Sequence, residues 1–248
     1  MFLTTIGLAA LLQPATPTSS PEAAQLCDAL ERTERPNPME LHNLATCLFR
    51  GEGRPRDLTR ARALYSQAVE GGFPRAMCAL GNMMINRLGG PRDVAGGLAL
   101  CRRAAEAGDA NAQTDLGGYL LVGRVVAKDP VEARRWLTAA AEQGQPNAAF
   151  LLGQIHWNGD GIAKNNAEAA RWWRIAHERG RPDAAYLLAR EAMARLTSRG
   201  RENLDSAVLQ EALDWFDLAA RTDPNAANRA DAAEKAALLR RLQAARRR

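Results

Sequence analysis

Aromatic residues and histidines are scarce in this chain, and long apolar runs are missing. Phe, Trp and Tyr make up only 5% of the 248 residues, and there are three histidines. The apolar stretch from Phe2 to Leu12 is too short to cross a bilayer as a helix. Stable insertion into a membrane is therefore not expected.

Sequence patterns that carry catalysis or bind metals are missing too. No Gly-x-Ser-x-Gly sequence occurs, and the four cysteines form no Cys-x-x-Cys pair. The histidines His42, His156 and His177 stand far apart, with no carboxylate at ligand spacing. We therefore expect no catalytic residue, no metal site and no cofactor, and we predict that the protein is not an enzyme.

The body of the chain carries no net positive charge. The formal net charge is +5, but five of the last nine residues are arginines: Arg240, Arg241, Arg246, Arg247 and Arg248. Without them the net charge is 5 − 5 = 0. A nucleic-acid-binding domain carries its positive charge on a folded face, so no nucleic-acid partner is expected. The tail is either a solvated helix end or a contact for an acidic partner or anionic lipid.

The stretch from Phe2 to Leu12 has the length of the apolar region of a secretory signal. A polar, Pro-rich run, QPATPTSSP, follows it, although no Lys or Arg precedes Leu12 and no clean small-x-small cleavage site follows. We expect residues 1–20 to be a signal peptide and linker. The protein is then periplasmic or secreted, with a cytoplasmic location as the alternative.

A period of 36 residues runs through most of the chain. Successive rows begin at Glu40, Ala76, Ala112, Ala148 and Ala184. The fifth position of each row is a leucine: Leu44, Leu80, Leu116, Leu152 and Leu188. A later column holds a carboxylate or an amide: Asp57, Asp93, Asp129 and Asn165. Recurrence at one offset in several columns predicts a repeat array.

Each row reads as two helices. In the first, which we call helix A, apolar residues recur every three or four positions. The carboxylate column stands just before the second, helix B, where such side chains cap orphan backbone N–H groups. Helix B ends at a glycine suited to a left-handed cap: Gly72, Gly108, Gly144 and Gly180. Such hairpins bury their apolar faces only by stacking on one another.

The fold class predicted from these rows is all-α, an α/α hairpin solenoid. A leading helix occupies residues 21–39, the five repeats fill 40–226, and a capping helix with the basic tail covers 227–248. Row five is lengthened by an insertion, which we place in the loop TSRGRENLDSA between two helices.

Row four, AAFLLGQIHWNGDGIAKNNAEAARWWRIAHERGRP, resembles the Sel-one-like repeat, a tetratricopeptide-like family. The matching positions are Leu152, Gly153, Gly159, Gly161, Ala169, Trp172, Trp173, Ala176 and Gly180. Row three keeps Leu116, Gly117, Gly123, Asp129, Ala133, Trp136, Ala140, Ala141 and Gly144. Row two departs from the pattern, because Arg87 replaces the first turn glycine.

The resemblance implies a right-handed superhelix and an adaptor or scaffold role in protein complexes. Bacterial relatives are often exported and cysteine-stapled, and some are linked to the cell wall or to β-lactam binding. We therefore favour a non-enzymatic protein-interaction scaffold that is exported. The alternative is a cell-wall-directed protein that binds peptidoglycan or has weak, β-lactamase-like hydrolase activity. A fold alone does not name the ligand.

The cysteine positions suggest two disulfides. Cys27 and Cys47 lie at similar heights on two antiparallel helices, at a rise of 1.5 Å per residue. Cys78 and Cys101 face each other less evenly, within row two. Such pairs are typical of proteins in an oxidising compartment.

The resemblance also places helix A on the concave side of the array. There the third, seventh and eleventh row positions form a stripe, because residues four apart share a helix face. The candidate groove residues are His42, Arg50, Asn82, Asn86, Phe150, Gln154, Asn158, Tyr186 and Arg190. Such a stripe suits an extended peptide or a helix of another protein. The alternative is that these are solvent or packing positions, and the oligomeric state is left open.

Overall fold

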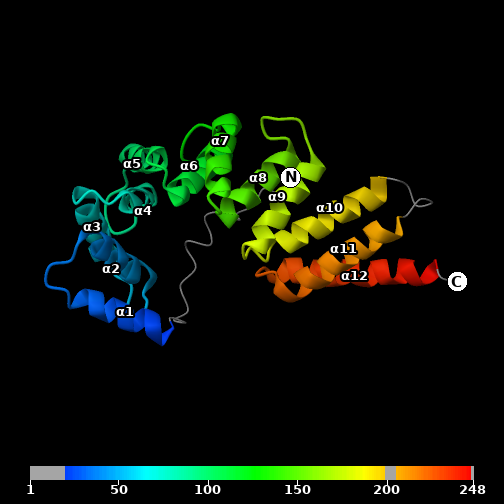
Figure 1. Cartoon of the computed structure of the whole chain (residues 1–248), viewed down its shortest axis with the longest axis horizontal. Helices are drawn as coiled ribbons and strands as arrows, with labels where there is room; N and C mark the ends of the chain where they lie inside the picture. The colour runs from blue at the N-terminus through cyan, green and yellow to red at the C-terminus, as the bar shows by residue number, and fades with distance from the viewer. Residues whose placement is uncertain (1–19, 199–204, 247–248) are drawn as a thin grey trace. The chain divides into compact units, whose positions relative to one another are not determined.

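The computed structural model describes residues 20–198 and 205–246, and within these ranges the chain forms twelve α-helices (Figure 1). Consecutive helices pack as hairpins, which confirms the all-α class. The expected signal peptide, most of the expected insertion loop and the last two arginines lie outside the described residues. The chain divides into two compact units: unit 1 is Met1–Lys128 and unit 2 is Asp129–Arg248.

Unit 1 holds the leading helix and the first hairpins. Its helices are α1 (Pro21–Glu31), α2 (Pro38–Arg50), α3 (Leu58–Glu70), α4 (Pro74–Ile85), α5 (Val94–Glu106) and α6 (Ala110–Val122). Within the unit α2 packs on α3 and α4 on α5, and α4 also contacts α6 directly. The A helices α4 and α6 therefore present neighbouring side chains.

Unit 2 continues the same pattern to the end of the chain. Its helices are α7 (Pro130–Glu142), α8 (Pro146–Asn158), α9 (Asn166–Glu178), α10 (Ala184–Ser198), α11 (Ser206–Thr222) and α12 (Ala226–Ala245). Here α8 packs on α9, α10 on α11, and α11 on α12. The basic tail begins on the last turns of α12.

The column of carboxylates and amides caps the B helices, as its position predicts. The side chains accept hydrogen bonds from the backbone N–H groups two or three residues later. Asp57 accepts from Arg60, and Asp93 accepts from Gly96. The start of each B helix in the repeats is thus set by one local interaction.

The turn glycines adopt backbone conformations that side chains disfavour. The four glycines after the B helices have φ between 83° and 100°. Gly51, Gly123 and Gly159 end A helices at φ of 72° to 78°. Arg87 occupies the equivalent position after α4 and keeps the left-handed conformation, with φ of 57°. Row two therefore keeps the left-handed turn but has arginine in place of glycine, the residue that adopts this conformation at the lowest free-energy cost.

The core of each unit is built from the repeated apolar columns. All five leucines of the fifth column are buried, with 1% to 8% of their surface exposed. Trp173 is the largest fully buried side chain, and its indole N–H donates to the Phe150 carbonyl at 3.2 Å. Gly153 makes room for this ring, because a Cβ there would stand 2.3 Å from Trp173 Cδ1.

Within the described ranges, no helix combines the length and the apolar character that a bilayer crossing requires.

Candidate interaction surface

The nine candidate groove residues divide between the two units. His42, Arg50, Asn82 and Asn86 belong to unit 1, and the other five belong to unit 2. Each set is therefore described within its own unit, and a continuous groove through all five repeats stays a prediction.

Asn82 on α4 lies at the centre of a polar cluster that sequence analysis did not foresee. Its Nδ2 donates to Asp115 Oδ2 on α6 at 2.6 Å. Its Oδ1 accepts from the Tyr119 hydroxyl at 2.7 Å. Asn86, which ends α4, donates from Nδ2 to the Asn82 backbone carbonyl at 2.8 Å. The cluster thus joins the A helices of two successive repeats by side chains alone.

The environment of this cluster shifts two pKa values. Burial raises the pKa of Asp115 to about 6, against the hydrogen bond from Asn82, and the nearby carboxylate of Asp109 adds to the rise. Burial and the charge of Asp115 raise the pKa of Tyr119 to about 12. Near neutral pH the cluster therefore holds a carboxylate whose ionisation costs free energy, a common property of functional sites.

The Asp115 carboxyl makes a pH-dependent contribution to stability. Its folded-state pKa of about 6 lies above the ordinary value of 3.8, so the folded state binds a proton more tightly than the unfolded state. Stability is therefore lost as pH rises through this interval, and the loss is complete above it. We expect Asp115→Asn to exceed the wild type by about 2 kcal/mol near pH ~8, after a discount for partial exposure, and by much less near pH ~4.

Urea unfolding of both proteins at the two pH values measures this difference. Because the two proteins differ only at position 115, the contributions of the other titrating groups to the unfolding free energy cancel in the difference. Asparagine also keeps an oxygen that accepts the hydrogen bond from Asn82. A difference in unfolding free energy that does not change with pH would mean that Asp115 ionises normally.

His42 is half-buried on α2 and packs among aromatic rings. Its ring centroid lies 5.3 Å from that of Tyr65 and 5.2 Å from that of Phe73. Burial, and then the positive charge of Arg75, lower the pKa of His42. The imidazole is therefore neutral near pH ~7, and it offers a partner an aromatic edge rather than a charge.

Two further candidates are exposed but engaged in short-range contacts. Arg50, whose side chain is 64% exposed, pairs with Glu52 at 3.2 Å. Asn158 donates from Nδ2 to Asp160 Oδ2 at 3.2 Å. Such exposed contacts contribute little to stability, so both side chains can exchange them for a partner.

Phe150 corrects the proposed stripe. It was one of the candidate groove residues, but only 5% of its surface is exposed. The Arg181 guanidinium covers its ring at 4.2 Å and is itself held by Asp183 and by Asn147 Oδ1, the latter at 2.6 Å. Phe150 is therefore a packing residue, and the groove prediction was wrong for this position.

Tyr186 and Arg190 do share a surface, on α10. The Tyr186 hydroxyl donates to Asp231 Oδ2 on α12 at 2.7 Å, and Lys235 binds the other oxygen of Asp231. The Arg190 guanidinium lies 5.9 Å above the Tyr186 ring and is exposed. Gln154 on α8 is half-buried. Burial, and then the bond to Asp231, raise the pKa of Tyr186 to about 12, so it stays a neutral donor.

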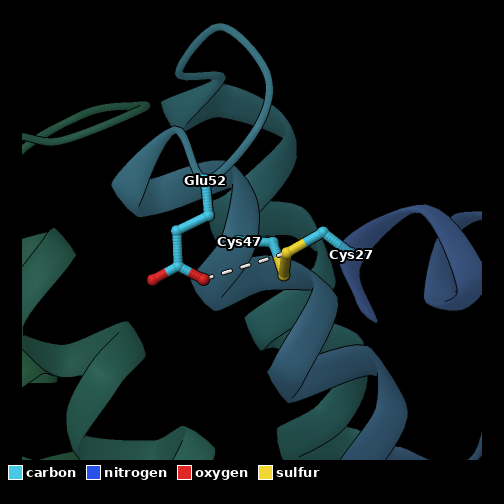
Figure 2. Close-up of side chains that lie close together, drawn as sticks. All are labelled: Cys27, Cys47 and Glu52. Carbon is cyan, nitrogen blue, oxygen red and sulfur yellow. Dashed lines mark hydrogen bonds between the residues drawn. A yellow bond between two sulfur atoms is a disulfide. The ribbon is translucent and has the colours of Figure 1, made fainter. Parts of the chain in front are cut away.

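The structure joins Cys27 to Cys47, the first pair expected from the sequence. Their Cα atoms lie 5.9 Å apart, and the bond ties α1 to α2. Figure 2 shows the Glu52 carboxylate beside this disulfide, with Oε2 3.8 Å from Cys27 Sγ. The three side chains have the mutual spacing of metal ligands, but cysteines bind metals as thiolates, and these sulfurs are bonded to each other.

The second disulfide joins Cys78 to Cys101, also as expected. Their Cα atoms lie 4.1 Å apart, and the bond connects α4 to α5 within one hairpin. Cys78 Sγ lies 3.7 Å from Asp115 Oδ2, so this disulfide forms one wall of the polar cluster. Two buried disulfides are typical of a protein that folds in an oxidising compartment outside the cytoplasm.

Sequence reasoning missed Asp115 and Tyr119 because both lie outside the assumed stripe. A signal for Asp115 was nevertheless present. In the other rows its column holds only uncharged residues: Asn43, Ala79, Leu151 and Leu187. A single carboxylate in an otherwise uncharged column of helix A marks the repeat that differs.

Two carboxyl groups converge in unit 2, on α10 and α11. Arg195 Nε donates to Glu191 at 2.9 Å, and its NH2 group donates to Glu211 at 2.6 Å. Burial raises the pKa of Glu191. For Glu211, the hydrogen bonds and charges of Arg195 and Arg174 together outweigh burial and lower the pKa. A pair bridged by arginine is a structural ion network and not an acid–base dyad for hydrolysis.

Comparison with known proteins agrees with this architecture. Among solved structures, the chain is similar to a Sel1 repeat protein from Oxalobacter formigenes, with 23% identity and a TM-score of 0.68 over 87% of this chain and 95% of that one. It is also similar to a protective antigen of uropathogenic Escherichia coli strains that displays an SLR fold. That match has 27% identity and a TM-score of 0.63, and covers 90% of this chain but 48% of the antigen.

No curated protein matches the chain. Five consecutive Sel1 repeats match residues 41–73, 74–109, 110–145, 146–180 and 182–221. These ranges cover most of the 248 residues. The chain therefore belongs to the Sel1 repeat family.

Proposed function

We propose that this protein is a non-enzymatic scaffold that binds another protein through the A helices of its repeats. The bound element is an extended peptide or a helix. The observation that carries the proposal is the A-helix surface of unit 2. There Tyr186 is held in place by Asp231, and the exposed Arg190 lies above its ring. Preorganised aromatic and arginine side chains are the residues that dominate protein interfaces.

The proposal includes an exported location, in the periplasm or outside the cell. The two disulfides support it, because they persist where thiols are not kept reduced. Mass spectrometry of native material tests the location, since export with cleavage removes Met1.

The binding role is tested with two matched double variants. Gln154→Ala with Arg190→Ala removes side chains from the A helices of unit 2. Arg103→Ala with Arg135→Ala removes arginines from B helices, and Arg135 stacks on Trp136 at 5.0 Å. All four positions are at least partly exposed, so both variants should fold.

The partner is first captured by cross-linking in native cell-envelope extract, and its affinity for each variant is then measured. We expect at least about a tenfold loss for the A-helix variant and about none for the B-helix variant. The opposite order would show that the B-helix face binds. Equal affinity for all three proteins would remove the A-helix surface of unit 2 from consideration.

The alternative is a cell-wall-directed protein that binds peptidoglycan or has weak, β-lactamase-like hydrolase activity. Its hydrolase form would need a nucleophile or an acid pair in one open site. The convergent Glu191 and Glu211 do not provide it, because Arg195 binds both carboxylates. The scaffold role is therefore the one that we put forward.

A further inference from the structure

We propose that Asp115, which lies on α6 and contacts Asn82 of α4 in unit 1, binds a cationic side chain from a basic segment of the partner protein. The proposal rests on the scaffold function and adds to it the chemistry of the bound segment. The juxtaposition that carries it is a preorganised carboxylate with one oxygen unused and no positive charge beside it.

The carboxylate is held by one oxygen only. Oδ2 accepts from Asn82 Nδ2, and Asn82 is itself fixed by the Tyr119 hydroxyl. Oδ1 accepts no hydrogen bond from any residue in 20–198 and 205–246, and it is not among the buried unpaired atoms of those ranges. Oδ1 therefore keeps some accessible surface on a half-buried side chain, and it can still accept a hydrogen bond.

No neighbouring positive charge among the described residues compensates the negative charge of the Asp115 carboxylate. No ion pair to Asp115 forms within the described chain, and the nearby Asp109 adds a second negative charge. Arg75 on α4 contacts Asp109 at 3.6 Å, not Asp115, and its side chain is 69% exposed. The facing groups on α4 and α5 are the Cys78–Cys101 disulfide and two asparagines, and none of these carries a charge.

A poorly hydrated carboxylate without a counter-ion is costly, and a cation relieves that cost. The same loss of hydration raises the pKa of Asp115. An ammonium or guanidinium group fits better than a divalent metal ion. One carboxylate and one amide supply too few oxygen ligands for calcium, and the neighbouring sulfurs are bonded to each other. The Asn86 side chain lies alongside and can bond the backbone of an extended segment.

The experiment uses the full chain, labelled with nitrogen-15, and two probe peptides. One is acetyl-Gly-Gly-Lys-Gly-Gly-amide, and the other carries norleucine in place of lysine, which keeps the alkyl chain and removes the charge. Each peptide is titrated at low salt while the side-chain amide signals of Asn82 and Asn86 are followed. The titration is repeated with Asp115→Asn, which keeps an acceptor for Asn82, and with Glu106→Gln, which removes an equal charge from an exposed position on α5.

We expect the lysine peptide to shift the Asn82 signal, and to bind Asp115→Asn about tenfold more weakly or not at all. Glu106→Gln should bind as the wild type does, and the norleucine peptide should leave the signal in place. Equal shifts from both peptides, or unchanged lysine binding by Asp115→Asn, would overturn the proposal. Partner binding that still depends on Gln154 and Arg190 would then show that the scaffold function stands without this contact.

Discussion

Replacing Gly81 by alanine is expected to destabilise the protein by about 3 kcal/mol or more. A Cβ at this position would stand 2.4 Å from the Gly97 carbonyl oxygen and 3.0 Å from Cys101 Sγ. Gly97 makes the reciprocal approach, since its own Cβ would lie 2.5 Å from the Gly81 carbonyl oxygen. The clash is with backbone, and the Cys78–Cys101 disulfide holds the two helices together. Neither α4 nor α5 can therefore move to accommodate the added methyl group without a large cost in free energy.

Urea unfolding followed by circular dichroism measures the loss, with Ala189→Gly as the matched control. Ala189 occupies the same column of row five, is fully buried, and tolerates its own Cβ. Its replacement removes one methyl group and lowers helix propensity, which together cost about 1 to 2 kcal/mol. If Gly81→Ala costs no more than this control, the close approach of α4 and α5 is not real.

The sixth position of each row, which contains Gly81, Gly153 and Ala189, shows what a sequence pattern can and cannot predict. It holds only alanine or glycine in the five rows, which is typical of closely packed helices, but the pattern does not identify the atoms that approach. The structure supplies two different partners, a backbone carbonyl for Gly81 and the Trp173 ring for Gly153. A repeat period aligns equivalent positions, but it does not say which atoms cross between neighbouring helices.

The same limit explains which site residues were found. Caps at Asp57 and Asp93 were predictable because a cap acts within three residues of sequence. The burial of Phe150 was not, because Arg181 covers it from beyond the following helix. Asn82 was identified from its helix face, whereas its partner Asp115 lies one repeat away on an unexpected face.

The predicted pairing of Cys27 with Cys47 is correct, but their predicted distances from the turn between α1 and α2 are not. We placed Cys27 and Cys47 at similar distances from the connecting turn. In the structure α1 already ends at Glu31, so Cys27 lies nearer that turn than Cys47 does. The short helix α1 packs mainly on α2.

Breaking the Cys27–Cys47 bond is expected to release α1 from unit 1. Among the eleven residues of α1 only Cys27 and Leu30 are buried, and Leu26 is 58% exposed. Burial of one leucine contributes about 2 kcal/mol. The ion pairs of Arg54 with Asp28 and Glu31 add at most about 1 kcal/mol each, and so does the pair of Arg60 with Glu31. Fixing the backbone of each helical residue costs about 1 kcal/mol or more, so the helix depends on its covalent link.

Hydrogen exchange of the double variant Cys27→Ser with Cys47→Ser tests this, helix by helix. We expect the α1 amides to lose at least about a hundredfold of their protection, because a free helix of this length is marginal in water. The matched control is Cys78→Ser with Cys101→Ser. There α4 and α5 still pack on each other, and Met83, Ile85 and Ala104 on them are buried. Both helices should therefore stay protected although the protein is less stable. Full protection of α1 in the first variant would mean that packing alone docks it, and the disulfide would then only add to a contact that already holds.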